Sequence, residues 1–280
     1  MRIRARRQVA RGVLVVLWTV ALLAAASGSV PGAQPIRLAT SFDRDATAGS
    51  ATAVHVAVRV DPQLADKPLD EVSFAYPRGL GVVSSGLGLA ACTRPQSDFV
   101  RVLIVAPPLG GCPPNSVMAI GTARALVKLT TGGQVIPEYA LVTLLSGSFE
   151  QGRLGLVVYV DGQHPFGAKL AFAGEARDAG APYGGELTFR LPAIPGIEDL
   201  ATIYLTQMRL TIGSHAIRYY QRRGGREVAY RPEGVLLPTR CPRAGYRFRV
   251  RVGFVDGTST TATSVTPCPP SAVATPSFGR

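Results

Sequence analysis

Apolar and polar residues alternate with a period of two over much of the chain. From Thr52 to Val60, valine occupies every even position from 54 to 60, and smaller or polar residues occupy the odd positions. Since successive side chains of a β-strand point to opposite faces, this segment predicts a strand with one buried face. Further strands are predicted at Glu71 to Tyr76, Phe99 to Val105, Ala119 to Leu129, Gln134 to Leu145, Leu154 to Val160, Ala168 to Ala173, Glu186 to Leu191, Ala201 to Ile212, Tyr246 to Phe254 and Thr258 to Thr266.

Glycine-containing turn sequences separate most of these segments, at residues 131–133, 146–147, 161–162, 179–180, 183–185, 223–225 and 256–257. Such spacing is typical of antiparallel hairpins. The 31 glycines and 22 prolines are spread along the chain and no helical stripe is sustained, which indicates an all-β fold. An antiparallel β-sandwich of meander hairpins is favoured, because a single sheet would leave one apolar face in water. An open barrel, or two small β domains divided near residues 146–152, are the alternatives.

The first 33 residues have a different pattern. Five arginines precede an apolar run from Val13 to Ala26 that contains a single hydroxyl residue, Thr19, and the small-residue stretch Ser27 to Ala33 follows. This order predicts a signal peptide at residues 1–33, and the run is too short for an ordinary transmembrane helix. We therefore expect a β domain at 34–268, a Pro/Ser/Ala-rich disordered tail at 269–280, and a secreted or cell-envelope-associated protein without a transmembrane anchor.

All four cysteines follow the predicted signal peptide, namely Cys92, Cys112, Cys241 and Cys268. Disulfides are the expected state in an oxidising compartment. Of the three pairings, the local one is favoured, Cys92 with Cys112 and Cys241 with Cys268, since a hairpin turn at 256–257 would bring the last two together. Because the chain has neither Cys-x-x-Cys nor clustered histidines, we expect no metal and no cofactor.

The basic charge is concentrated late in the chain. The signal peptide holds five of the 30 basic residues and none of the 18 acidic ones, which leaves a net charge of +7. Eleven arginines but only two acids lie from Arg209 to Arg251. One interpretation of these arginines is a solvated strand face. The other is an anion-binding surface, because guanidinium groups on one face attract phosphate and carboxylate. The candidate anion-binding residues are Arg247, Arg249, Arg251, Arg222 and Arg223.

Anionic cell-envelope polymers or lipid head groups are the expected partners of these arginines. Export would carry the protein away from nucleic acid, so no nucleic acid partner is expected. Gly86-x-Gly88 precedes a poor helix sequence and is interpreted as a tight turn that leads to a disulfide.

No residue pattern predicts a catalytic site. There is no Gly-x-Ser-x-Gly sequence, and His55, His164 and His215 occupy strand or turn positions without a local partner. The central hairpins contain the carboxylates Glu138, Glu150, Glu175 and Glu186, but the single tryptophan lies in the signal peptide, whereas sugar clefts usually contain indole platforms. Asp43-x-Asp45 is interpreted as a solvated loop, since further calcium ligands do not follow.

Two parts of the sequence resemble a family of secreted, uncharacterised actinobacterial proteins. The first runs from Leu87 to Cys92 and from Cys112 to Ala123, with a Cys-Pro-x-x-Ser segment, and the second comprises Leu236 to Tyr246, Phe254 to Gly257 and the closing Pro267-Cys268-Pro269. These motifs consist of cysteines, prolines and turn glycines. The resemblance implies no activity, ligand or catalytic residue.

The sequence thus predicts an exported, non-enzymatic β protein that acts as a binding or structural module. Two alternatives remain. One is an extracellular hydrolase with a site assembled from separate strands, and the other is a carrier of a small apolar ligand, which requires a cavity between the sheets.

Overall fold

The computed structural model describes residues 35–61, 64, 67–81, 86–93, 108–191 and 201–270. Within these ranges the regular structure is almost entirely β-strand, with short 3-10 turns such as Pro108–Gly111 and Pro114–Ser116. The all-β, antiparallel prediction is confirmed. The predicted signal peptide at 1–33, the predicted strand from Phe99 to Val105 and residues 271–280 of the predicted tail lie outside the described residues.

Eleven strands form one antiparallel sheet in the order β1-β3-β10-β5-β6-β7-β8-β9-β4-β14-β15. They are β1 (Ile36–Phe42), β3 (Val54–Val60), β4 (Leu69–Pro77), β5 (Val117–Leu129), β6 (Val135–Glu150), β7 (Arg153–His164), β8 (Lys169–Asp178), β9 (Tyr183–Arg190), β10 (Ala201–Ile212), β14 (Tyr246–Phe254) and β15 (Ser259–Thr266). Two short pairs complete the described strands, β11 (Tyr219–Arg223) with β12 (Arg226–Tyr230) and β13 (Val235–Leu236) with β2 (Ala51–Thr52).

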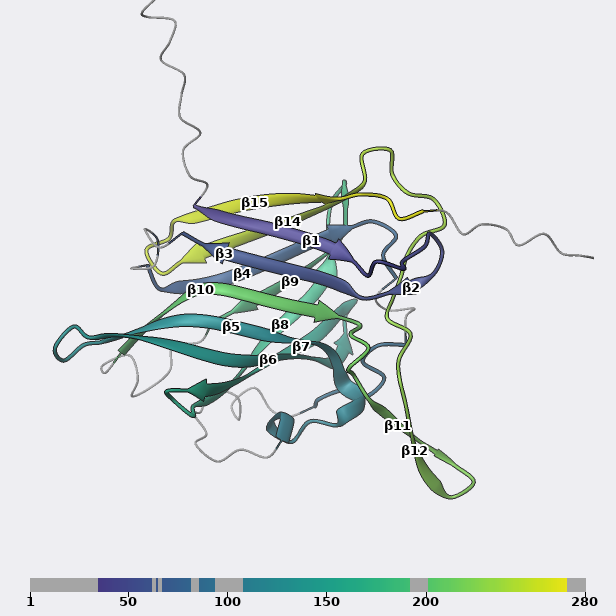
Figure 1. Cartoon of the computed structure of the whole chain (residues 1–280), viewed down its shortest axis with the longest axis horizontal. Helices are drawn as coiled ribbons and strands as arrows, with labels where there is room; N and C mark the ends of the chain where they lie inside the picture. Colours follow the sequence, from purple (N-terminus) through teal and green to yellow (C-terminus); the bar gives the residue numbers. More distant parts are fainter. Residues whose placement is uncertain are drawn as a thin grey trace, which may run out of the picture. The chain divides into compact units, whose positions relative to one another are not determined.

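The edge strands β1 and β15 meet, so that the sheet is nearly closed into a barrel (Figure 1). Thr40 Oγ1 on β1 donates to Ser264 Oγ at 3.0 Å and lies 2.7 Å from Thr266 Oγ1 on β15. Among the expected arrangements, the structure agrees with the open barrel. The two apolar layers for which a sandwich was favoured are opposite walls of one sheet. Strand twist accumulates across eleven strands, and bulges in several of them add curvature.

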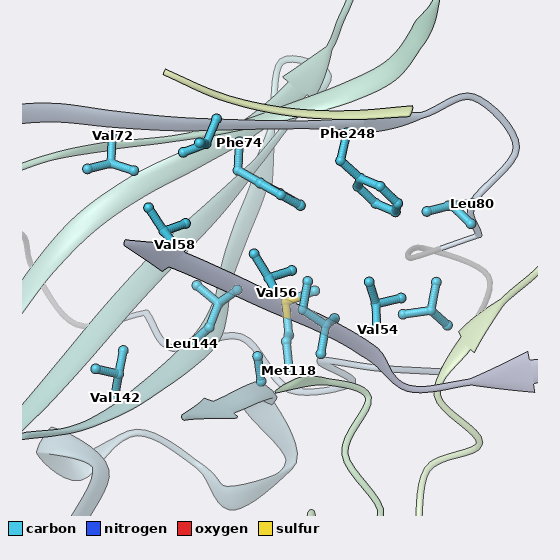
Figure 2. Packing of buried hydrophobic residues seen from close by; sticks show 14 of the residues in the cluster. Val54, Val56, Val58, Val72, Phe74, Leu80, Met118, Val142, Leu144 and Phe248 are labelled. Carbon is cyan, nitrogen blue, oxygen red and sulfur yellow. The ribbon is translucent and has the colours of Figure 1, made fainter. Parts of the chain in front are cut away.

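Inward-facing side chains fill the barrel. Val54, Val56 and Val58 of β3 are buried, as the alternation predicts. Figure 2 shows these valines opposite Phe74 of β4 and Phe248 of β14, whose stacked rings have centroids 5.7 Å apart. Each fully buried valine or phenylalanine contributes about 1.5–3 kcal/mol, so this core is the main source of stability.

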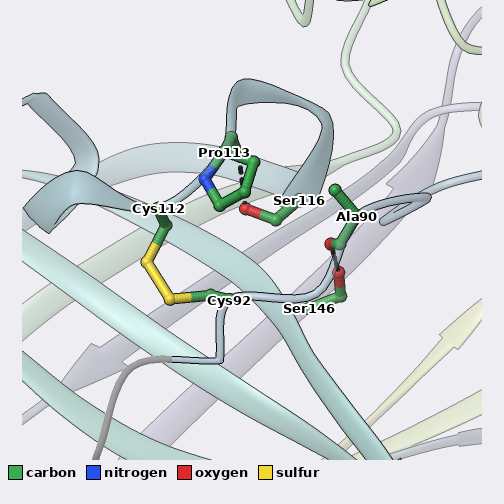
Figure 3. The surroundings of a disulfide bond; sticks show 6 residues. All are labelled: Ala90, Cys92, Cys112, Pro113, Ser116 and Ser146. Atoms are coloured by element: carbon green, nitrogen blue, oxygen red, sulfur yellow. Dashed lines mark hydrogen bonds between the residues drawn. A yellow bond between two sulfur atoms is a disulfide. The ribbon is translucent and has the colours of Figure 1, made fainter.

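A second apolar cluster lies on the opposite face of β5, β6 and β7, outside the barrel. Its buried members are Cys92, Cys112, Val117, Leu145, Val157, Tyr159, Ile217 and Tyr219. The loop at 86–93 covers this cluster and is fixed by Ser146, whose Oγ donates to Ala90 O at 2.7 Å and whose carbonyl accepts from Cys92 N at 2.8 Å (Figure 3). A loop and a short hairpin thereby shield apolar strand residues from water.

Both disulfides have the predicted local pairing. Cys92 is bonded to Cys112 within the outer cluster (Figure 3), and Cys241 is bonded to Cys268. In the second case β14 and β15 pair through the predicted turn at 256–257, and Tyr246 lies opposite Thr266 close to the bond. The hairpin argument for this pairing is therefore confirmed.

Three of the predicted turns are wrong. Residues 146–147, 161–162 and 183–185 lie within or at the start of β6, β7 and β9. The glycines there allow close backbone approach: a Cβ on Gly147 would lie 2.9 Å from the Gly155 carbonyl carbon, and one on Gly162 would lie 2.5 Å from Phe166 O. Residues 146–152 accordingly form the end of β6 and its turn into β7 within one sheet.

Candidate functional site

The barrel interior contains a cavity of about 370 Å³. Its walls are mainly apolar and include Val54, Phe74, Met118, Leu156, Leu187 and Phe248. The strand registers place all of these at the same end of the barrel, where β4, β6, β8 and β10 end and β3, β5, β7, β9 and β14 begin. Successive side chains of a strand point to opposite faces, and this alternation turns each wall residue into the barrel. The side chains that face inward at this end belong to nine different strands.

A cap crosses this end of the barrel, formed by residues 79–81 together with β2 and β13. Gly81 bridges Leu236, β13 pairs with β2, and Leu237 N donates to Ser50 O at 2.9 Å. Leu80 and Val235 of the cap line the cavity and are buried. The cap therefore shields the cavity from water along the axis of the barrel.

The mouth of the cavity is formed by Phe149, Gly152, Arg177 and Asp178, which are exposed yet line it. Phe149, at the end of β6, is 67% exposed, which places it among the most exposed large apolar side chains of the described residues. Arg177 is paired with Glu186 at 3.4 Å, whereas Asp178 has no ion pair with any described residue. The mouth thus combines the exposed aromatic ring of Phe149 with the carboxylate of Asp178, which has no ion pair among the described residues.

Tyr76 lies just inside the mouth, and its hydroxyl sits where a side chain on Gly185 would be. Burial raises the pKa of this phenol, and the negative charge of Asp178 raises it further. Tyr76 is consequently a neutral hydroxyl at physiological pH. A hydroxyl and a carboxylate at the mouth, with apolar walls behind them, can hold a molecule that has an apolar body and a polar end.

Two of the predicted anion-binding arginines lie together on the outer face of the sheet. Arg249 and Arg251 of β14 line a polar pocket of about 280 Å³, to which β8 adds Arg177. Arg249 contacts Glu186 at 3.1 Å and lies over the ring of Tyr183, 4.7 Å from its centroid.

The other three predicted arginines are elsewhere. Arg247 does not line this pocket, and it lies opposite Val265, beyond the last residue of β14 that pairs with β4. Arg222 and Arg223 are exposed on the β11–β12 hairpin, which Figure 1 shows well apart from β14. The sequence reasoning grouped arginines that are close in sequence, whereas the pocket also draws Arg177 from β8.

Two histidines that sequence reasoning left without partners share one carboxylate. Asp43 Oδ1 lies 2.9 Å from His55 Nε2, and Asp43 Oδ2 lies 3.2 Å from His215 Nε2. His55 Nδ1 lies 3.2 Å from Thr211 Oγ1. Asp43 is therefore not the solvated loop residue that was expected, because its side chain is only 19% exposed.

The pKa of Asp43 is lowered. Burial alone would raise it, but the N–H of Ala53, the hydrogen bond from His55 and the charges of His55 and His215 together outweigh that effect. The Thr211, His55 and Asp43 side chains follow the order of a nucleophile, base and acid, but neither of the two cavities is lined by them. The cluster ties the turn after β1 to β3 and to the loop after β10.

The central carboxylates have separate partners. Glu175 pairs with Arg153 at 3.3 Å, Glu138 Oε2 accepts from Phe166 N at 3.0 Å, and Glu186 belongs to the outer pocket. In the part of the chain that the structure describes, no group of histidine, cysteine and acidic residues is arranged to hold a metal ion. No helix among the described residues is long and apolar enough to cross a membrane.

The glycine pair at 86–88 forms a turn, as predicted. Gly88 has a φ of +66°, and its N–H donates to the buried hydroxyl of Tyr219 at 2.7 Å. A Cβ at this position would lie 2.7 Å from the side chain of Ser146, so glycine is required both by conformation and by space.

Comparison with models of known protein families, with curated proteins and with solved structures finds no match. The cavity residues escaped sequence reasoning because each belongs to a different strand and has an ordinary apolar side chain. Phe149, a large apolar residue between Gly147 and Gly152, is a sequence feature that could have drawn attention to the mouth.

Proposed function

We propose that this chain is an exported binding protein that holds a small amphipathic molecule at the capped end of its barrel. The single observation that carries this function is the interior cavity of about 370 Å³, with apolar walls and polar groups confined to its mouth. Ligand cavities in proteins commonly have volumes of about 300–1,000 Å³ and a few placed polar groups.

The ligand would place its apolar body between β4, β7, β9 and β14 and its polar end beside Tyr76 and Asp178. An uncharged or cationic polar end is favoured, because Arg177 is already paired with Glu186 while Asp178 has no ion pair among the described residues. An anionic end would face the carboxylate of Asp178 and lose affinity.

Secretion or association with the cell envelope is part of this proposal. The arginine-rich, apolar start of the chain supports export. The two disulfides suggest an oxidising setting, in which such bonds persist. The sequence resemblance to secreted actinobacterial proteins points in the same direction, and the net charge of +7 that remains without residues 1–33 suits contact with an anionic envelope.

Fluorescence titration with N-phenyl-1-naphthylamine, an uncharged apolar dye, tests the proposal. We expect one saturable site whose affinity falls at least tenfold in Ala176→Phe, since the added ring would occupy the cavity beside Leu187. Ala229→Phe is the matched control, because Ala229 is exposed on β12. A folded Ala176→Phe protein that binds the dye as well as the native protein would refute cavity binding.

A further inference from the structure

The outer pocket of about 280 Å³ is a separate hollow from the interior cavity, and Arg177 is the one lining residue that the two share. It spans β8, β9, β4, β14 and β15, on the face of the sheet that points away from the barrel core. We infer that this pocket binds a singly charged oxyanion group, of the kind carried by a sulfate ester or a phosphodiester.

The shape of the pocket follows from the register of the strands. A middle row of side chains crosses four strands and consists of Thr188, Ser73, Arg251 and Thr261, which lie side by side. Long charged side chains flank this row, with Glu186 and Arg249 on one side and Glu71 and Arg190 on the other. Because three members of the middle row have short side chains, a hollow forms between two ridges of long ones.

The charges in and around the pocket do not cancel. Glu186 contacts Arg177 at 3.4 Å and Arg249 at 3.1 Å, and Glu71 contacts Arg190 at 3.4 Å and Arg251 at 3.8 Å. Two carboxylates are thus shared by four guanidinium groups, which leaves a surplus of two positive charges. A monoanion reduces this surplus without reversing it, whereas a dianion would meet stronger repulsion from the two glutamates.

Hydrogen-bond donors remain for a ligand. A guanidinium group has five N–H donors, and the contact of Arg251 with Glu71, at 3.8 Å, is an ion pair but not a hydrogen bond. Thr188 Oγ1 is buried and has no hydrogen-bond partner among the described residues. A buried hydroxyl without a partner is unfavourable, and because Thr188 lines the pocket, a rotation of its side chain toward a ligand oxygen would remove the penalty.

Arg249, in the row that flanks the hollow, is preorganised. The guanidinium group of Arg249 lies over the Tyr183 ring, 4.7 Å from its centroid, and Glu186 holds it on the other side, with Ser73 donating to the same carboxylate at 3.2 Å. Ordering a flexible arginine costs conformational entropy, and here that cost is met before a ligand arrives. Tetrahedral oxyanions suit the site, since guanidinium groups and hydroxyls approach from different directions.

Titration with methyl sulfate, followed by the 15N–1H signals of the arginine Nε groups, tests this inference. We expect the Arg249 and Arg251 signals to shift with one dissociation constant, and Arg249→Gln/Arg251→Gln to weaken binding at least tenfold. Arg222→Gln/Arg223→Gln is the matched control, since it removes the same charge from the β11–β12 hairpin and should change affinity less than twofold. Equal weakening by both double variants, or by neither, would overturn the inference.

Thr188→Val provides a second variant that keeps the fold. Valine has nearly the shape of threonine but lacks the unpaired hydroxyl, so we expect unchanged or higher thermal stability together with at least threefold weaker methyl sulfate binding. Unchanged affinity in this variant would contradict the role of Thr188. Dextran sulfate in a parallel titration distinguishes sources of the anion: tighter binding per sulfate group than methyl sulfate indicates a polymer, and equal binding indicates a small molecule.

Discussion

The hydroxyl of Tyr219 holds the covering loop on the outer face of the barrel, and its removal gives a sharp test of the outer cluster. Tyr219 is fully buried, its hydroxyl donates to Val117 O at 2.5 Å, and it accepts from Gly88 N at 2.7 Å. Tyr219→Phe keeps the ring and its edge contact with Tyr230 but leaves two backbone groups without this partner.

Each buried polar group that loses its partner costs about 1–3 kcal/mol, so for two such groups we expect Tyr219→Phe to lower the free energy of unfolding by about 2–6 kcal/mol. For a domain of this size, 1 kcal/mol corresponds to roughly 2–4 °C in Tm, which gives a loss of roughly 4–24 °C. Differential scanning calorimetry measures this loss. Amide hydrogen exchange at Gly88 should also become faster, because its N–H no longer has an acceptor.

Tyr220→Phe is the control for this experiment. Tyr220 is 41% exposed, and its hydrogen bonds to Asn115 use the backbone N and O. Loss of its hydroxyl should change stability by less than about 0.5 kcal/mol. If Tyr219→Phe and Tyr220→Phe proved equally stable, the hydroxyl of Tyr219 would not hold the loop, and the reasoning would be refuted.

Three further predictions concern the fold. Gly121→Ala should destabilise the protein by about 3 kcal/mol or prevent folding, because its Cβ would lie 1.9 Å from Arg209 O. Thermal melts measure this effect, and the control Gly167→Ala, which has open space around it, should leave Tm unchanged. Cys92→Ser/Cys112→Ser opens a link across 20 residues and should cost about 3 kcal/mol in urea unfolding, and a cost below about 1 kcal/mol would contradict it. The folded-state pKa of Asp43 lies below its ordinary value of 3.8, so the ionised carboxylate stabilises the fold above that pH, and this stabilisation is lost as the pH falls through the folded-state pKa. The Tm advantage of the native protein over Asp43→Asn should therefore shrink from about pH 5 to about pH 2. A constant Tm difference would count against this prediction.

Strand positions could be predicted because alternation reports burial on one face directly. The prediction for Thr52 to Val60 agrees with β3, whose even-numbered valines are all buried. It missed β1 (Ile36–Phe42), which follows the predicted signal peptide and pairs along its whole length with β3. Glycine was the least reliable signal, since Gly147 and Gly162 serve close backbone contact within strands rather than turns.

Closure of the sheet and both pockets could not be predicted from the sequence. Whether two apolar layers belong to separate sheets or to one curled sheet depends on which strands pair, and β10 joins β3 to β5 across a long sequence separation. The outer pocket depends on the register of β9, β4 and β14, which aligns Thr188 with Ser73 and Arg251. A shift of one residue would turn these side chains inward.

The central claim is that a small amphipathic molecule binds inside the barrel, and methionine methyl NMR tests it most directly. The chain has methionines at 1, 118 and 208, and Met118 lines the cavity whereas Met208 packs against the core without lining it. With 13C-labelled methionine methyl groups, saturating N-phenyl-1-naphthylamine should shift the Met118 signal and give intermolecular NOEs to the dye, with Met208 nearly unchanged. An unshifted Met118 signal under saturating dye would contradict the account.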